Sequence, residues 1–182
     1  MTRQTSGDGS RWTTRMLLIC AALAAVQAVA SLGVSPVTPA IATAAPPLYA
    51  LVAAVHSVMP FLARILTRAP WSATLTAGVA GALVWPFSPI GPLFIVALVT
   101  GAAAFDVALL GSRSAAWRRL IPAAAFAGVS LFVVSLPVFS PDHLTPVVLT
   151  ATLLGRLGGE LIALALAGGL ASGLLRSGVR VR

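Results

Sequence analysis

Lysine is absent from this sequence of 182 residues, and acids and cysteine are almost absent. Without lysine the chain has neither a P-loop lysine nor a Schiff-base lysine for pyridoxal phosphate or retinal, so it is not itself an ATPase. Its single cysteine, Cys20, excludes disulfides within the chain and cysteine-based zinc sites. We therefore predict no metal and no cofactor.

Charged residues are also scarce: they make up 9% of the chain, against about 25% in an ordinary soluble domain. Hydrophobic residues make up 58%, and the mean hydropathy is +0.98. These values are typical of a membrane protein, and the length leaves room for one polytopic domain. The net charge of +8 comes from arginines that alternate with apolar runs, so we expect a lipid bilayer as the partner and no nucleic acid.

Catalytic patterns are missing from the sequence. A serine nucleophile needs a histidine and an acid, but neither His56 nor His143 lies near a G-x-S-x-G motif. A two-carboxylate site would have to use Asp106 with Glu160, and a basic neighbour competes for each. We therefore predict that the chain is not an enzyme.

Long apolar stretches dominate the chain, and about 17 to 25 such residues are enough to cross a bilayer as a helix. The sequence contains six of them: 16–34, 46–66, 71–87, 90–111, 120–139 and 144–175. They predict an all-α membrane protein with six transmembrane helices. The sixth stretch is long, so we expect it to be tilted, broken near Gly158 and Gly159, or extended past the membrane.

The arginines predict the orientation, because cytoplasmic loops retain positive charge. Arginines precede the first stretch and follow the second, fourth and sixth, whereas the connections 35–45, 88–89 and 140–143 hold none. Both termini are therefore predicted to be cytoplasmic. The chain is expected to consist of a disordered N-terminal tail (1–14), the membrane domain (15–176) and a basic C-terminal tail (177–182). For the first stretch, a cleaved signal peptide is the alternative.

Ionisable groups within predicted spans are costly to place in a membrane, so each is a candidate for function. Arg156 and Glu160 stand at i and i+4, which places them on one helix face as a predicted pair. This pair either binds a polar solute or holds the bundle in register. His56 either donates to a ligand, pairs with Glu160 or bonds to a neighbouring helix. Asp106 is predicted to be a structural charge, paired with one of the arginines at 113, 118 or 119.

Small residues are frequent in the first stretch, where Ala21, Ala25 and Ala28 belong to overlapping small-xxx-small spacings. Such spacing allows another helix to approach closely, either a partner subunit or a helix of the same bundle. The connection 35–45 is uncharged and contains prolines, so it either covers a binding site as a lid or acts as a plain connector.

The whole pattern resembles the substrate-binding S components of energy-coupling-factor (ECF) vitamin transporters, in the branch without assigned substrates. The resemblance covers residues 15–175 and consists of six spans with both ends inside, an alanine-rich first helix and Pro46-Pro47-Leu48-Tyr49 opening the second. A short basic turn at 64–70 follows, and the segment 101–106, Gly-Ala-Ala-Ala-Phe-Asp, runs into a basic loop.

The resemblance implies a subunit of a multi-pass importer in the bacterial plasma membrane. Such a subunit captures a small vitamin-like or precursor solute from outside and works with a transmembrane coupling subunit and two ATPase subunits. Carried over here, Ala21, Ala25 and Ala28 form the docking face and the connection 35–45 is the gate. The implied substrate site combines three ionisable residues, His56, Arg156 and Glu160, with two aromatic residues, Tyr49 and Trp85. The alternative is a membrane scaffold without a solute, in which Arg156 and Glu160 are purely structural.

Overall fold

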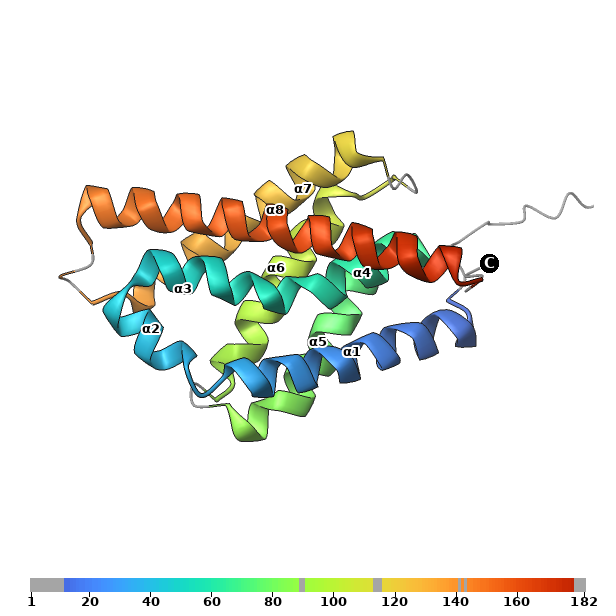
Figure 1. Ribbon diagram of the computed structural model, residues 1–182, viewed down its shortest axis with the longest axis horizontal. Helices are drawn as coiled ribbons and strands as arrows, with labels where there is room; N and C mark the ends of the chain where they lie inside the picture. The colour runs from blue at the N-terminus through green and yellow to red at the C-terminus, as the bar shows by residue number, and fades with distance from the viewer. Residues whose placement is uncertain (1–11, 89–90, 113–115, 141, 143, 179–182) are drawn as a thin grey trace, which may run out of the picture.

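The structure is a computed structural model that describes residues 12–88, 91–112, 116–140, 142 and 144–178 (Figure 1). The described chain contains helices and short connections and no strand. In order, the elements are α1 (Thr14–Val34), α2 (Thr38–Ala44), α3 (Pro46–Val52), η1 (Ala53–Ser57), α4 (Val58–Thr67), α5 (Ser72–Val84), η2 (Trp85–Phe87), α6 (Leu93–Ala108), α7 (Trp117–Ser135), η3 (Leu136–Val138) and α8 (Pro146–Arg176). The predicted disordered tail lies largely outside the described residues, as do 179–182 of the basic tail.

Four helical segments are long and apolar enough to cross a membrane: Thr14–Val34, Pro46–Thr67, Trp117–Ser135 and Pro146–Arg176. Two shorter apolar helices, Ser72–Phe87 and Leu93–Ala108, occupy the third and fourth predicted stretches. The all-α class of membrane protein is therefore confirmed. Of the three expectations for the sixth stretch, a break near Gly158 and Gly159 is wrong, because α8 continues through both glycines for 31 residues.

The second predicted span is interrupted, which the sequence analysis did not anticipate. Between α3 and α4 the chain forms the 3-10 turn η1. Pro60 explains the interruption, since it has no N–H and its ring clashes with the carbonyl four residues earlier, that of His56. At this interruption a side chain of α1 bonds to the backbone, since Oε1 of Gln27 accepts a hydrogen bond from the Met59 N–H at 3.3 Å. This interruption places His56 and Ser57 beside the cavity described below.

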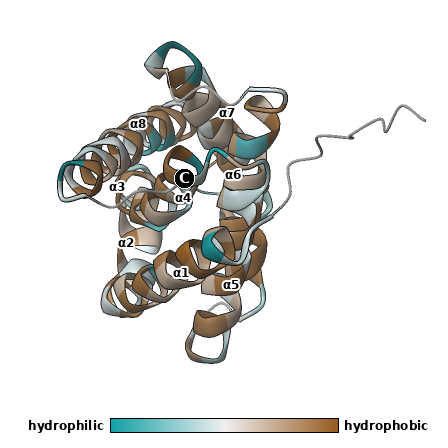
Figure 2. Ribbon diagram, turned by 90° about the vertical axis from the view of Figure 1, so that its right-hand side faces the viewer, coloured by the Kyte–Doolittle hydropathy of each residue, from teal (hydrophilic) through white to brown (hydrophobic). Residues whose placement is uncertain are grey.

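The helices pack around α4, which lies in the middle of the bundle in the end-on view (Figure 2). α4 contacts α1, α5, α6 and α8, while α3 packs along α8 and α7 packs between α6 and α8. Alanine dominates the contacts at the centre; the buried cluster includes Ala24, Ala54, Ala73, Ala77, Ala80, Ala102, Ala123, Ala124, Ala127, Ala163, Ala167 and Ala171. Small side chains let helix backbones approach closely, which is the usual packing in membranes.

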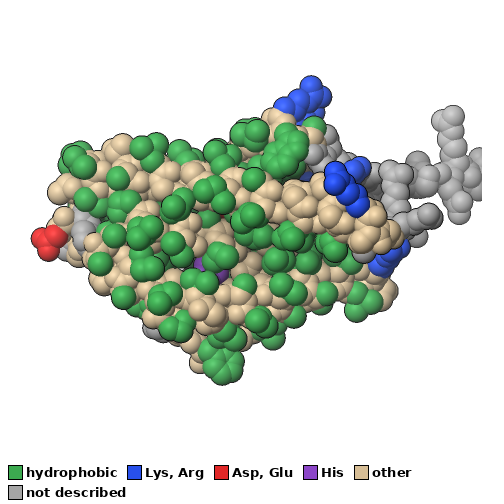
Figure 3. All heavy atoms as spheres, viewed as in Figure 1, with side chains coloured by type: hydrophobic (Ala, Val, Ile, Leu, Met, Phe, Trp, Pro, Cys, Tyr) green, Lys and Arg blue, Asp and Glu red, His purple; other side chains and the backbone are tan. Residues whose placement is uncertain are grey.

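The sides of the bundle are apolar, whereas several charged groups are buried inside it, an arrangement that is unusual in a soluble protein. Hydrophobic side chains are spread over the face seen in Figure 3. Among the exposed hydrophobic residues of the chain, Val29, Val147 and Leu154 are more than 60% accessible. Arg64, Asp106 and Glu160 are buried. The chain is thus a multi-pass membrane protein, because only lipid makes such an exterior favourable.

A buried ion pair joins three helix ends. Arg64, in the last turn of α4, lies with Nε 3.1 Å from Oδ1 of Asp106 in α6. Oδ2 of Asp106 accepts hydrogen bonds from the N–H and hydroxyl of Thr74, in the first turn of α5. Arg64 also donates to the carbonyls of Leu109 and Ser112 beyond the end of α6. The Asp106 carboxylate thus accepts hydrogen bonds at the N-terminus of α5, and the Arg64 guanidinium donates to carbonyl groups at the C-terminal end of α6.

Asp106 is therefore paired with Arg64, and the prediction of Arg118 or Arg119 as its partner is wrong. Arg118 and Arg119 are exposed, and Arg113 lies outside the described residues. The reason is that Arg64, expected among the loop arginines, is still inside the helical bundle and only 5% exposed.

Candidate functional site

A cavity of about 120 Å³ lies among α1, α2, α3, η1, α4, α6, α7 and α8. One water needs roughly 10–15 Å³, so the cavity has room for a small solute. Its polar lining residues are Ser31, Ser35, Thr38, Tyr49, His56, Ser57, Ser88 and Arg156. Its apolar lining comprises Phe61, Phe94, Leu98 and Leu131, together with alanines and prolines. Apolar walls with a few placed polar groups are typical of small-molecule sites.

The residues from 35 to 45 form part of this wall. They fold into the short helix α2, and Ser35, Thr38, Pro39 and Ala42 line the cavity. Pro39 lies in the first turn of α2, where a proline costs no intrahelical hydrogen bond. The connection is therefore in contact with the cavity, as the lid expectation requires.

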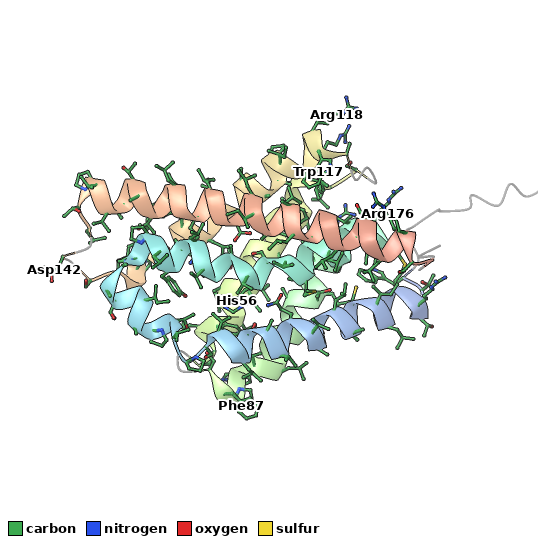
Figure 4. All side chains as sticks on the ribbon, viewed as in Figure 1. His56, Phe87, Trp117, Arg118, Asp142 and Arg176 are labelled. Carbon is green, nitrogen blue, oxygen red and sulfur yellow. The ribbon has the colours of Figure 1, made fainter. Side chains whose placement is uncertain are left out.

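His56 is held by a chain of hydrogen bonds from α1. The Gln27 amide is oriented by the Met59 N–H, so its Nε2 donates to Oγ of Ser31 at 3.2 Å. Ser31 Oγ lies 2.9 Å from Nδ1 of His56 and forms a hydrogen bond with it, whose direction depends on the tautomer of the imidazole. Figure 4 shows His56 near the middle of the molecule, and Phe94 packs against its ring edge to face with centroids 5.3 Å apart.

Arg156 lines the cavity from α8 and lies over the ring of Tyr49, with Cζ 5.5 Å from the ring centroid. This distance is within the range of a cation–π contact. The residue is only 7% exposed, and its Nε has no hydrogen-bond partner. Within the described part of the chain, it is the one charged side chain of the cavity lining other than histidine.

Glu160 lies one turn further along α8 and is fully buried. Its Oε1 accepts a hydrogen bond from the hydroxyl of Ser57 at 3.0 Å, and its Oε2 has no partner. The side chains of Arg156 and Glu160 do not come within 4.0 Å as an ion pair, so the predicted direct pairing is wrong. The physical reason is that each side chain turns to a different helix: Arg156 to Tyr49 of α3 and Glu160 to Ser57 of η1.

Of the five predicted substrate residues, the structure brings three into the lining: Tyr49, His56 and Arg156. Glu160 is not part of the lining, but it accepts a hydrogen bond from the lining residue Ser57. Trp85 lies outside it, because α5 ends at Val84 and the turn η2 leaves the indole 48% exposed on the surface. Ser31, Ser57 and Phe94 also line the cavity and were not predicted. Pro60 could have indicated this region of the chain, since a proline within an apolar span marks a broken helix.

The three predicted docking alanines do not share one surface. Ala21 and Ala25 are exposed on α1, whereas Ala28 is 7% exposed and packs inward. Ala28 lies only about 40° around the helix from the buried Ala24, whereas Ala25 lies about 100° from it.

Comparison with known proteins provides one strong match in three dimensions. No protein-family model and no curated protein sequence matches the chain. A crystal structure of an S-component of an ECF transporter superposes with a TM-score of 0.83, covering 93% of this chain and 88% of that one, at 23% sequence identity. The chain has the fold of an ECF transporter S component. The resemblance predicted from the sequence is thus confirmed at the level of the fold, and the cavity lies inside an S-component scaffold.

Proposed function

We propose that this protein is the substrate-capture subunit of an ECF-type importer in the bacterial plasma membrane. It binds a small vitamin-like or precursor solute from outside and delivers it with a separate transmembrane coupling subunit and two ATPase subunits. The chain itself catalyses no reaction. The observation that carries this proposal is the cavity of mixed polar and aromatic lining inside the S-component fold.

The distribution of charge supports six spans with both termini in the cytoplasm. Arg118 and Arg176 lie at one end of the molecule and Asp142 at the other (Figure 4). In the proposed orientation the arginine-rich end is cytoplasmic. The cavity draws on the last turns of α1, on α2 and on the first half of α6, which belong toward the opposite end. A solute therefore reaches the cavity from outside.

The exposed part of α1 is the proposed docking face for the coupling subunit, and it is defined here as Ala21 and Ala25. We expect Ala25→Leu to reduce co-purification of the coupling subunit roughly tenfold, because the larger side chain holds the partner helix away. Pull-down from membranes that co-express the coupling and ATPase subunits measures the effect. Ala165→Leu is the matched control, since Ala165 is also exposed but lies on α8. Equal recovery of partners with both variants contradicts a docking face on α1.

Purification of the full chain in mild detergent, followed by native mass spectrometry and denaturing extraction, tests the proposed function. We expect a co-purified small metabolite bound at one per chain, and coupling subunits when these are co-expressed. A chain that holds no solute yet still retains other membrane proteins contradicts solute capture and favours a scaffold.

A further inference from the structure

Arg156 is a buried cation that forms no ion pair within 4.0 Å among the described residues. It is 7% exposed, its Nε makes no hydrogen bond, and Glu160 is not within ion-pairing distance. The Tyr49 ring below it provides a cation–π contact but no negative charge. A buried charge without a hydrogen-bonded counter-charge is unfavourable, and inside a membrane protein this cost is high. The geometry therefore favours a ligand that supplies the missing anion.

The location of Arg156 decides where that anion binds. The residue lines the cavity, and no carboxylate among the described residues lines it. The rest of the lining is neutral: serine and threonine hydroxyls, the Tyr49 phenol and the His56 imidazole. Within the lining, a bound anion thus meets one positive charge and several hydrogen-bond donors, while the buried acid Glu160 lies outside the lining and accepts a hydrogen bond from Ser57.

We propose that the cavity takes a small organic monocarboxylate, whose carboxylate group is held by the Arg156 guanidinium while its remaining part packs between His56, Phe61 and Phe94. This rests on the proposed function and specifies the chemical class of the solute. One lining cation balances one negative charge, which favours a carboxylate over a doubly charged phosphate. The planar guanidinium fork also matches a carboxylate in a bidentate geometry.

The binding test compares acids with neutral compounds of nearly the same shape. Thermal unfolding of the full chain in detergent is followed with benzoate and benzamide, nicotinate and nicotinamide, biotin and biotinamide, and pantothenate and panthenol, with inorganic phosphate as the dianion. We expect at least one acid to raise Tm by several degrees while its neutral counterpart does not. Stabilisation by the neutral members alone, by phosphate alone, or by no acid overturns the proposal.

Variants then locate the effect. Arg156→Gln is expected to weaken binding of the stabilising acid roughly 10–100-fold, since a hydrogen bond to a charged group is lost. Arg156→Lys keeps the charge without the fork and should bind with intermediate affinity. Arg176→Gln removes a charge from the same helix at an exposed position and should bind as the wild type does. Unchanged binding by Arg156→Gln overturns the proposal. If Arg156→Gln does not fold, each acid is judged against its neutral counterpart on the wild-type chain.

The metabolite that co-purifies with the chain separates this inference from the proposed function. An acid supports both. A cationic or neutral solute overturns the carboxylate assignment and leaves solute capture standing. Absence of any solute, together with no shift from any probe, contradicts both.

Discussion

Replacing Asp106 with asparagine is expected to lower the free energy of unfolding by about 3–5 kcal/mol, because it leaves the buried Arg64 guanidinium without a counter-charge. For a chain of this size that loss corresponds to a fall in Tm of roughly 6–20 °C. The side-chain oxygen of asparagine can still accept a hydrogen bond from Thr74, so the fall in stability measures mainly the loss of the negative charge. Thermal unfolding in detergent measures it.

Two further variants make the result specific. Asp142→Asn removes an exposed carboxylate and should leave Tm within a degree or two of the wild type. The double change Arg64→Leu with Asp106→Leu removes both charges and should recover part of the loss, since apolar residues often replace a buried pair at little cost. Recovery will be incomplete, because Arg64 also donates to the carbonyls of Leu109 and Ser112. A Tm for Asp106→Asn equal to that of Asp142→Asn contradicts a stabilising role for the pair.

Gly155→Ala is expected to be the second most damaging change, because α3 and α8 are in backbone contact at this glycine. A Cβ there would lie 2.5 Å from the Pro47 carbonyl oxygen, and this oxygen belongs to the backbone and cannot rotate away. The helices must separate, which costs about 1–3 kcal/mol by the usual penalty for overpacking. Because Tyr49 and Arg156 lie on these two helices, the same change should also weaken binding of any cavity ligand.

The same helix offers a matched control. A Cβ at Gly158 would meet nothing within 4 Å, so Gly158→Ala should be neutral or stabilising, since alanine favours a helix by up to about 1 kcal/mol over glycine. Thermal unfolding of the two variants in parallel measures the difference. Equal stability of both would show that the contact between α3 and α8 is not tight at Gly155.

Hydropathy and charge in the sequence were sufficient for the all-α class and for the membrane environment, because lipid imposes long apolar stretches on any spanning helix. They were not sufficient for the interior contacts. The i, i+4 spacing of Arg156 and Glu160 indicates proximity on one face, but their rotamers follow partners on α3 and η1 that no local pattern reveals.

Two other features needed three-dimensional information. Arg64 was counted as a loop charge, and only the packing of α4 against α5 and α6 makes it the partner of Asp106. Trp85 was predicted to be part of the substrate site, yet α5 ends at Val84 and the turn η2 leaves the indole exposed on the surface. Pro60, by contrast, could have been used, since the break at η1 follows from its missing N–H.

The alanine-rich interior has a consequence for how this protein tolerates mutation. An alanine loses no rotamer freedom when it is buried, so the helices assemble without that entropic cost, but it also leaves no side chain that can rotate to accommodate a larger neighbour. Random mutagenesis should therefore show a volume limit at positions such as Ala77, Ala124 and Ala167, where serine or glycine is accepted and leucine is not. Lipid-facing positions such as Val147 and Leu154 should instead accept apolar residues of any size.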